Sequence, residues 1–180
     1  MNYYQKIQYL TQVDKNDNIL GKIEKWRAHK NNILHRGYTT ILYYKNKIIL
    51  QRRNHPIFDK VFDLSFSSHQ VYINDKLQDN ILAIYDGLKR EWNLNKNDLI
   101  QSPEFITKFY YQAKDPSSEY AEHEIDYIYI VNLKTIPKPN LTYAYGIELI
   151  NSSEIKKLSK LFPNLAPWVI KEIDLLNSNE

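Results

Sequence analysis

The segment 122–130 carries acidic side chains at alternate positions of a stretch otherwise rich in β-branched and aromatic residues. That composition is typical of a strand, and side chains in a strand point to alternate faces. Glu122, Glu124 and Asp126 should therefore share one face. Close carboxylates repel each other unless a cation or a proton neutralises them or solvent screens them. The pattern is consistent with a cation site and equally with a solvent-exposed strand face.

Histidines elsewhere in the chain could complete a cation site. His29 and His35 lie in the polar segment 24–36, and His69 follows an apolar segment. Three imidazoles and two carboxylates suit a six-coordinate site for Mn²⁺, Mg²⁺ or Zn²⁺. Loop histidines are usually solvated, so the spacing leaves open whether these side chains meet. The chain has no cysteine, which excludes disulfides, thiolate ligands and a thiol nucleophile.

Composition is ordinary for a soluble globular protein. The chain has 180 residues, of which 43% are hydrophobic and 25% charged, enough to build the core of one domain. A net charge of +3 is too small to favour nucleic acid or a membrane surface as a partner. No apolar run approaches the roughly 18–20 residues of a membrane span, and the first residues lack the apolar core of a signal peptide. We expect one cytoplasmic domain over residues 1–180.

The chemically interesting residues must be positioned by alternating strands and helices. Apolar residues at spacings of three and four predict a helix over 77–92, and a Pro at the start of the segment after 166 predicts a terminal helix. Residues 152–154 are cap-type residues and predict another helix. Residues 24–36 and 52–56 are predicted to be loops. Strands are predicted over 7–13, 19–23, 38–44, 47–51, 105–112, 122–130 and 143–150. The expected fold class is α/β (α+β).

Residues 25–38, KWRAHKNNILHRGY, resemble the stretch K-x-x-A-H-x-x-x-L-L-H-R-A-F of the type I isopentenyl-diphosphate isomerases, a family of the Nudix superfamily. Four further blocks resemble motifs of this family in the same order. Residues 49–53 resemble L-L-Q-R-R, and residues 67–69 stand where the family has C-x-H. Residues 122–127 match E-H-E-x-D-Y, and residues 166–168 match T/S-P-W. The resemblance runs from about residue 13 to residue 168 and implies a Nudix fold, a mixed β-sheet sandwiched between helices.

The resemblance also implies binding sites. It implies a metal site formed by His29, His35, His69, Glu122 and Glu124. Glu91 matches a residue that helps to hold a second Mg²⁺, which meets the diphosphate of a small-molecule substrate. Lys25 and Arg52 match diphosphate-binding positions, and Arg53 is a further candidate, because fixed cations pair with phosphate oxygens.

The family moves a double bond in a five-carbon diphosphate, converting isopentenyl to dimethylallyl diphosphate through a tertiary carbocation. A proton is added on one face and another is removed on the opposite face. Glu124 and Tyr111 match the pair that serves one face, and Trp168 matches the aromatic that stabilises the cation through its ring face. Ser67 stands at the position of the Cys that serves the other face.

The departures from the family pattern bear on activity. A serine hydroxyl exchanges protons less readily than a thiol, whose pKa is about 8.5, so Ser67 needs a neighbour to act as an acid or a base. Asp63 and His69 are near in sequence, and His69 is expected to be committed to the metal. Gln70 replaces the Pro of C-x-H-P, residues 62–64 depart from W-T-N, and Asn93 replaces a Gly.

Two other functions remain open. A Nudix hydrolase would need several acids in the signature G-x5-E-x7-R-E-U-x-E-E-x-G-U; only Glu91 is retained, and Asp86 could supply a second carboxylate. A non-catalytic binder of metal and diphosphate would explain the missing Cys. The favoured function is isomerisation of isopentenyl diphosphate or a related allylic diphosphate, weakened by Ser67, in a monomer or homodimer.

Overall fold

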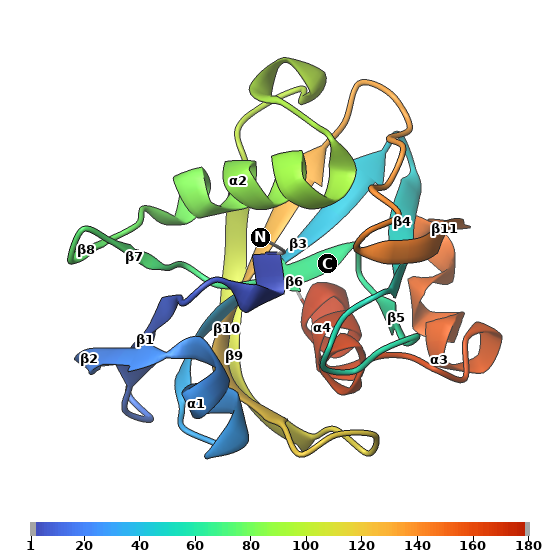
Figure 1. The fold of residues 1–180 in the computed structure, drawn as a ribbon. Coiled ribbons are helices and arrows are strands. Elements are labelled where there is room, and N and C mark those ends of the chain that lie inside the picture. The colour runs from blue at the N-terminus through green and yellow to red at the C-terminus, as the bar shows by residue number, and fades with distance from the viewer. Residues whose placement is uncertain (1–2, 179–180) are drawn as a thin grey trace.

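A mixed sheet runs through the centre of the molecule (Figure 1), in a computed structural model that describes residues 3–178. Within that range nine strands form the sheet: β1 (Tyr9–Val13), β2 (Ile19–Glu24), β3 (His35–Tyr44), β4 (Lys47–Arg53), β5 (Phe62–Asp63), β6 (Phe66–Ser68), β9 (Glu104–Lys114), β10 (Ala121–Asn132) and β11 (Ala144–Asn151). A separate hairpin pairs β7 (Tyr72–Ile73) with β8 (Lys76–Leu77).

Helical segments connect and cover these strands. The α-helices are α1 (Lys25–Lys30), α2 (Asn80–Trp92), α3 (Leu158–Leu161) and α4 (Pro167–Ser178), and the 3₁₀ segments are η1 (Tyr3–Gln5), η2 (Lys96–Asp98) and η3 (Ser152–Lys157). None of the helices between residues 3 and 178 is long and apolar enough to cross a membrane.

Strand β10 holds the centre of the sheet. It pairs in parallel with β3 and antiparallel with β9, and the other pairs of the sheet are antiparallel. The parallel register sets Glu124 beside His35, and the antiparallel register sets Glu124 beside Tyr111. Most of β10 is buried on both faces, so its acidic side chains do not form a solvent-exposed face.

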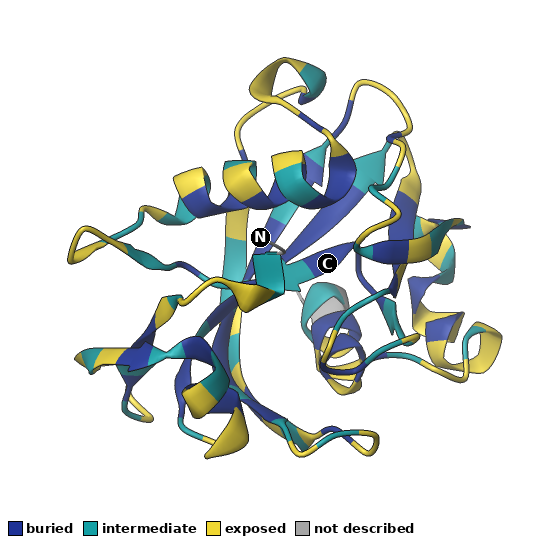
Figure 2. Ribbon diagram, in the orientation of Figure 1, coloured by how far each residue is buried: buried dark blue, intermediate teal, exposed yellow. Residues whose placement is uncertain are grey.

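Two apolar cores lie on opposite faces of the sheet. Because side chains alternate along a strand, Ile41 of β3 packs into the core that contains Trp168 of α4, whereas Leu42 packs into the core that contains Trp92 of α2. Figure 2 shows the central strands largely buried between these helices. The structure therefore confirms the expected mixed sheet sandwiched between helices.

Gly87 allows α2 to lie close to the sheet. A Cβ atom at Gly87 would come within 2.5 Å of Phe66 Cε2 and 2.9 Å of the Tyr38 hydroxyl. Gly87→Ala should therefore destabilise the protein by about 1–3 kcal/mol through overpacking, although Ala alone favours a helix by about 1 kcal/mol. Urea denaturation measures the change. The control Lys89→Ala, on the exposed face of the same helix, should change stability by less than about 0.5 kcal/mol.

Two segments predicted to be loops are regular structure. Residues 25–30 form α1, whose N-cap Glu24 accepts hydrogen bonds from the backbone N–H groups of Trp26 and Arg27. Arg52 and Arg53 extend β4, because they pair with β5 and β11. The helix predicted over 77–92 begins at Asn80, after the N-cap Asp79, and the segment after 151 is a 3₁₀ segment followed by the short α3.

Candidate active site

The three histidines and two glutamates singled out in the sequence come together at one end of β10. Glu122 and Glu124 belong to β10, His35 begins β3, His29 lies on α1 and His69 follows β6. Atoms of His29, His35, His69 and Glu122 lie within 4.8 Å of one another. Glu124 Oε1 lies 2.7 Å from His69 Nε2 and 3.3 Å from His35 Nε2, so Glu124 belongs to the same cluster.

The imidazoles of His29 and His69 are held in the neutral form that a metal ion requires. Burial lowers the pKa of His29 well below its usual range, and the neighbouring histidines lower it further. Burial also lowers the pKa of His69 to about 4, although Glu124 opposes the shift. His35 Nδ1 lies 2.7 Å from the carbonyl oxygen of Ile33. If Nδ1 donates its proton there when an ion is bound, Nε2 would present its lone pair to that ion.

The two carboxyls titrate differently. Burial and then the charge of Glu124 raise the pKa of Glu122 well above its usual range. Burial also opposes ionisation of Glu124, but hydrogen bonds from His35 and His69 outweigh it and lower its pKa well below the usual range. Without an ion, mutual repulsion should raise the pKa of both carboxyls; it does so for Glu122 but not for Glu124. One proton on Glu122 therefore removes the repulsion between the two carboxylates and leaves a single negative charge, on Glu124.

Unpartnered atoms of the cluster test whether a cation fits there. Within the described chain, both ring nitrogens of His29 and the Oε2 atom of Glu122 are buried without a hydrogen-bond partner, and His29 Nε2 lies 3.6 Å from that oxygen. Buried polar atoms are normally satisfied, and imidazole nitrogens with carboxylate oxygens are a usual donor set for divalent metals. The residues therefore fit a divalent cation.

Tyr111 joins the cluster to the apolar core. Its hydroxyl donates to Glu124 Oε2 at 2.5 Å, and burial followed by the charge of Glu124 raises its pKa well above 10. Tyr111 therefore stays protonated and donates a hydrogen bond. The ring of Trp168 lies 5.7 Å from the ring of Tyr111, and Ser67 lines the same cavity as both.

The structure separates the two arginines that were candidates for diphosphate binding. Neighbouring side chains on β4 point to opposite faces: Arg53 lines the cavity with Lys25 and Glu91, whereas Arg52 is exposed, with its guanidinium 5.8 Å from the ring of Tyr145. The assignment of Arg52 to the site is therefore corrected, because the alternation of β4 turns it away from the cavity.

Several residues of the cavity wall were not identified from the sequence: Tyr3, His55, Ser68 and Arg90. Arg90 donates to Glu91 Oε1 at 2.8 Å and to Ser68 Oγ at 3.0 Å, and its guanidinium lies 4.1 Å from the ring of Tyr3. There was little reason in the sequence to expect Arg90 in the cavity wall. It precedes Glu91 directly, and consecutive residues of a helix do not normally share a face. Figure 1 shows η1, which carries Tyr3, between α1, α2 and α4.

These side chains nearly fill the cavity. Its free volume is about 10 Å³, close to the least that holds one water molecule. Tyr3 lies over the cationic side chains of the wall, with the Lys25 Nζ atom 5.1 Å from its ring. The side chains of the wall, as they stand, therefore leave little room for a small diphosphate.

Three further carboxyls are buried beside this cavity. Asp63, Asp126 and Glu172 are at most 1% exposed. Burial and then the charge of Glu124 raise the pKa of Asp126, and burial and then the charge of Asp63 raise the pKa of Glu172 well above its usual range. In the described chain neither oxygen of Glu172 has a partner with hydrogen-bond geometry, although Thr39 and Asp126 are near enough to lower its pKa in part. Glu172 lies on α4, far along the chain from the others, so sequence spacing contained no signal for it.

Glu172→Gln should stabilise the protein at neutral pH. The folded state keeps a proton on Glu172 above pH 4.5, where the unfolded chain releases it, so the stability of the parent falls as the pH rises. Each pKa unit corresponds to about 1.4 kcal/mol, and we expect a gain of about 1–3 kcal/mol at pH 7 that vanishes near pH 4. Urea denaturation between pH 4 and pH 8 measures it. A curve parallel to the parent's, as expected for the exposed control Glu148→Gln, would contradict this assignment.

Comparison with known proteins gives one consistent family. The chain is 30% identical to isopentenyl-diphosphate Delta-isomerase 1 of Bos taurus, over 87% of this chain and 76% of that protein. It is 29% identical to the protein of the same name from Mesocricetus auratus, over 91% of this chain and 82% of that protein. No family model matches the chain.

Solved structures show the fold. A Deinococcus radiodurans protein has a TM-score of 0.65 at 14% identity and covers 92% of this chain and 97% of that one. A Nudix hydrolase from M. smegmatis has a TM-score of 0.51 at 9% identity and covers 94% of this chain and 92% of that one. At such identities the likeness concerns the fold alone. The chain thus has the Nudix fold and belongs to the family of isopentenyl-diphosphate Delta-isomerases.

Proposed function

We propose that the protein is a divalent-metal-dependent isomerase that converts isopentenyl diphosphate to dimethylallyl diphosphate or acts on a related allylic diphosphate. One observation carries the proposal: Glu124 and Tyr111, joined by a hydrogen bond, line the same cavity as Ser67 and Trp168. We further propose one Nudix-like domain over residues 1–180, a cytoplasmic location, and a monomer or homodimer that acts on a small-molecule diphosphate without nucleic-acid or membrane partners.

The cluster at the end of β10 would hold the metal. The proposed ligands are His29, His35, His69, Glu122 and Glu124, and the ion would be Mn²⁺, Zn²⁺ or Mg²⁺. A bound cation would supply positive charge that keeps both carboxylates ionised and lowers the pKa of groups that contact them. The unpartnered nitrogens of His29 and the neutral imidazoles of His29 and His69 support this assignment.

The chain's own residues would move the protons. Tyr111, hydrogen-bonded to Glu124, would add a proton to the terminal carbon of the substrate's double bond. The tertiary carbocation that results would be stabilised by the ring face of Trp168. Ser67 would then accept a proton from the neighbouring carbon, and the electrons of that C–H bond would form the new double bond. A closed cavity of buried side chains would keep water from the cation.

The serine makes this step slow compared with a thiol. A thiol has a pKa of about 8.5, close to working pH, whereas a hydroxyl is a far weaker acid and exchanges its proton only with help from a second group. We therefore propose that isomerisation is retained at a reduced rate.

The diphosphate would bind at the cationic end of the cavity. Lys25 and Arg90 line it, and Glu91 would hold Mg²⁺ against the phosphate oxygens. Arg53 is already paired with Asp63 at 2.8 Å, so it would contribute less charge to the ligand. Gln51 and Arg90 contact Glu91 and orient it.

Glu91→Gln should weaken the binding of inorganic diphosphate in Mg²⁺ by about tenfold or more, because a carboxylate ligand of the ion is lost, and should change it little without Mg²⁺. Isothermal calorimetry with and without Mg²⁺ measures both values. The matched control Glu148→Gln, on the exposed part of β11, should leave both unchanged. Equal weakening in the two conditions would contradict the bridging role.

The two alternative functions predict different outcomes in a turnover assay. A hydrolase would need further acids beside Glu91, and Asp86 does not provide one, since it is exposed, bonds Gln78 and lines a separate groove. A non-catalytic binder would keep metal and diphosphate affinity without turnover. A turnover assay with isopentenyl diphosphate tests the proposal: dimethylallyl diphosphate supports it, released phosphate indicates a hydrolase, and neither product indicates a binder.

A further inference from the structure

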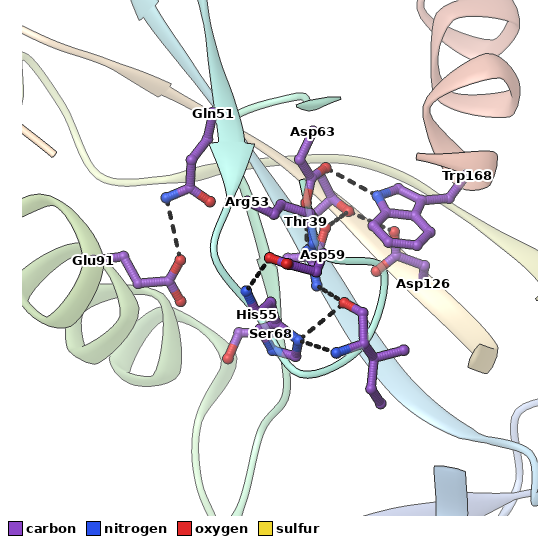
Figure 3. A network of polar contacts seen from close by, with 12 residues as sticks. Thr39, Gln51, Arg53, His55, Asp59, Asp63, Ser68, Glu91, Asp126 and Trp168 are labelled. Carbon is purple, nitrogen blue, oxygen red and sulfur yellow. Dashed lines mark hydrogen bonds and ion pairs between the residues drawn. The ribbon is translucent and has the colours of Figure 1, made fainter. Parts of the chain in front are cut away.

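Asp63 lies at the junction of the two residues that would handle the carbocation. The Ser67 hydroxyl donates to Asp63 Oδ2 at 2.9 Å, and the Trp168 indole N–H donates to Asp63 Oδ1 at 2.9 Å. Arg53 Nη1 donates to Oδ2 at 2.8 Å. Asp63 has no solvent exposure, and Figure 3 shows it between Arg53 and Trp168. A carboxyl that accepts three hydrogen bonds on its two oxygens is acting as a carboxylate.

The proton of Ser67 has two acceptors within reach, Asp63 Oδ2 at 2.9 Å and Thr39 Oγ1 at 3.0 Å. The Thr39 hydroxyl donates its own single proton to Asp126 Oδ2 at 2.8 Å. The Asp63 carboxylate is the stronger of the two acceptors, because a hydrogen bond to an ionised acceptor is roughly twice as strong as one to a neutral hydroxyl, so the proton of Ser67 is directed to Asp63. Ser67 is thereby aligned for transfer to a carboxylate, the arrangement that activates a weakly acidic hydroxyl.

We propose that Asp63 is the positioning residue through which Ser67 works: it takes the hydroxyl proton of Ser67 while Ser67 Oγ takes a proton from the substrate carbon. This role rests on the proposed isomerase function. In the step, the substrate C–H bond breaks and its electrons form the double bond. A new O–H bond forms on Ser67, the old O–H bond breaks, and its proton ends on Asp63. No free alkoxide is formed, and the reverse reaction uses the same groups.

The same carboxylate acts on Trp168. A hydrogen bond from the indole N–H to an anion increases the electron density of the ring, and the face of an electron-rich ring attracts a cation more strongly. Asp63 thus couples the proton acceptor and the cation-stabilising ring through one buried group. Arg53 compensates the negative charge of Asp63, which explains why this aspartate can be buried beside an apolar core.

The purely structural alternative is that Asp63 only neutralises Arg53. A comparison of two backgrounds separates the roles. Asp63→Asn is made in the parent and in a Ser67→Cys variant, and kcat and KM for isomerisation of isopentenyl diphosphate are measured in all four proteins. A thiol near neutral pH does not need a carboxylate to exchange its proton, so the two backgrounds should respond differently.

We expect Asp63→Asn to lower kcat of the parent by about 10²-fold or more with little change in KM, and to lower kcat by less than about tenfold in the Ser67→Cys background. Equal losses in both backgrounds would overturn the role of Asp63 and leave the isomerase function standing. A parent that forms no isomer would overturn the proposed function itself, and the role of Asp63 with it. If Asp63→Asn does not fold, Asp63→Glu keeps the charge beside Arg53, displaces the carboxylate by one methylene and serves in the same comparison.

A second measurement does not depend on turnover. The chain contains no cysteine, so the thiol of Ser67→Cys is the only one in the protein and its alkylation rate against pH gives its pKa directly. A neighbouring carboxylate disfavours the thiolate, so adding Asp63→Asn, which removes that charge, should lower this pKa by about one unit or more. An unchanged pKa would show that Asp63 does not act on this position and would overturn the proposal.

Discussion

Glu124→Gln is expected to lower kcat for isomerisation of isopentenyl diphosphate by about 10²–10⁴-fold, the usual contribution of a positioned acid or base. Glu124 contacts both the proposed metal ligands and the proposed proton donor: its Oε1 atom lies beside His69 and His35, and its Oε2 atom accepts a hydrogen bond from the Tyr111 hydroxyl. The amide retains the shape but removes the charge, so it weakens the metal cluster and deprives Tyr111 of its ionised partner.

Two measurements check this prediction. Turnover is followed with saturating Mn²⁺ or Zn²⁺ and Mg²⁺, and metal binding is followed separately by calorimetry in the absence of substrate. The loss of metal affinity should accompany the loss of rate, because the same carboxylate serves both. The exposed control Glu148→Gln should alter neither quantity. A Glu124→Gln variant with metal affinity and kcat within threefold of the parent would contradict the assignment of both roles.

Ser67 is the position at which the three candidate functions differ most. If the protein is an isomerase slowed by its serine, Ser67→Ala should abolish the remaining activity, and Ser67→Cys should raise the rate by up to about 10²–10⁴-fold, because a thiol exchanges protons more readily near neutral pH. Ser67 lines the cavity and is only partly buried, so neither small substitution should disturb the fold.

The outcomes separate the alternatives. In a hydrolase, where activated water would be the nucleophile, neither substitution at Ser67 should change the release of phosphate appreciably. In a binder, Ser67→Cys alone should yield no isomer, since Asp63, Leu64 and Gln70 also differ from the family pattern. Isomer formation from isopentenyl diphosphate is measured for the parent and both variants. A Ser67→Ala variant as fast as the parent would falsify a catalytic serine.

Local sequence patterns were sufficient for most of the sheet. The strands around residues 9–24, 35–53 and 104–132 follow the predicted ones within a few residues, because alternating apolar residues bounded by turn residues have few other ways to bury their side chains. The same alternation placed Glu122 and Glu124 on one face. The helix α2 follows from its apolar spacing, and only its start moved, to the residue after the capping Asp79.

Helix α1 could not be predicted in this way. It has six residues, fewer than an isolated helix needs to be stable in water, and it exists because Ala28 and His29 are buried against the sheet. The choice between Arg52 and Arg53 likewise depended on which face of β4 borders the cavity. That is a property of the pairing of β4 with β5 and β11, and a one-residue shift reverses it.

The sequence by itself determined the family, the alternation that puts two glutamates together and the residue types able to bind a divalent cation, because these depend on local spacing and on ordered motifs. Only the tertiary structure decided which groups meet across the chain. It brought Asp63 to Ser67 and to Trp168, 105 residues later, and buried Glu172 beside them. The physical reason is that burial and charge pairing, which set protonation and reactivity, arise from contacts between segments that sequence separation does not specify.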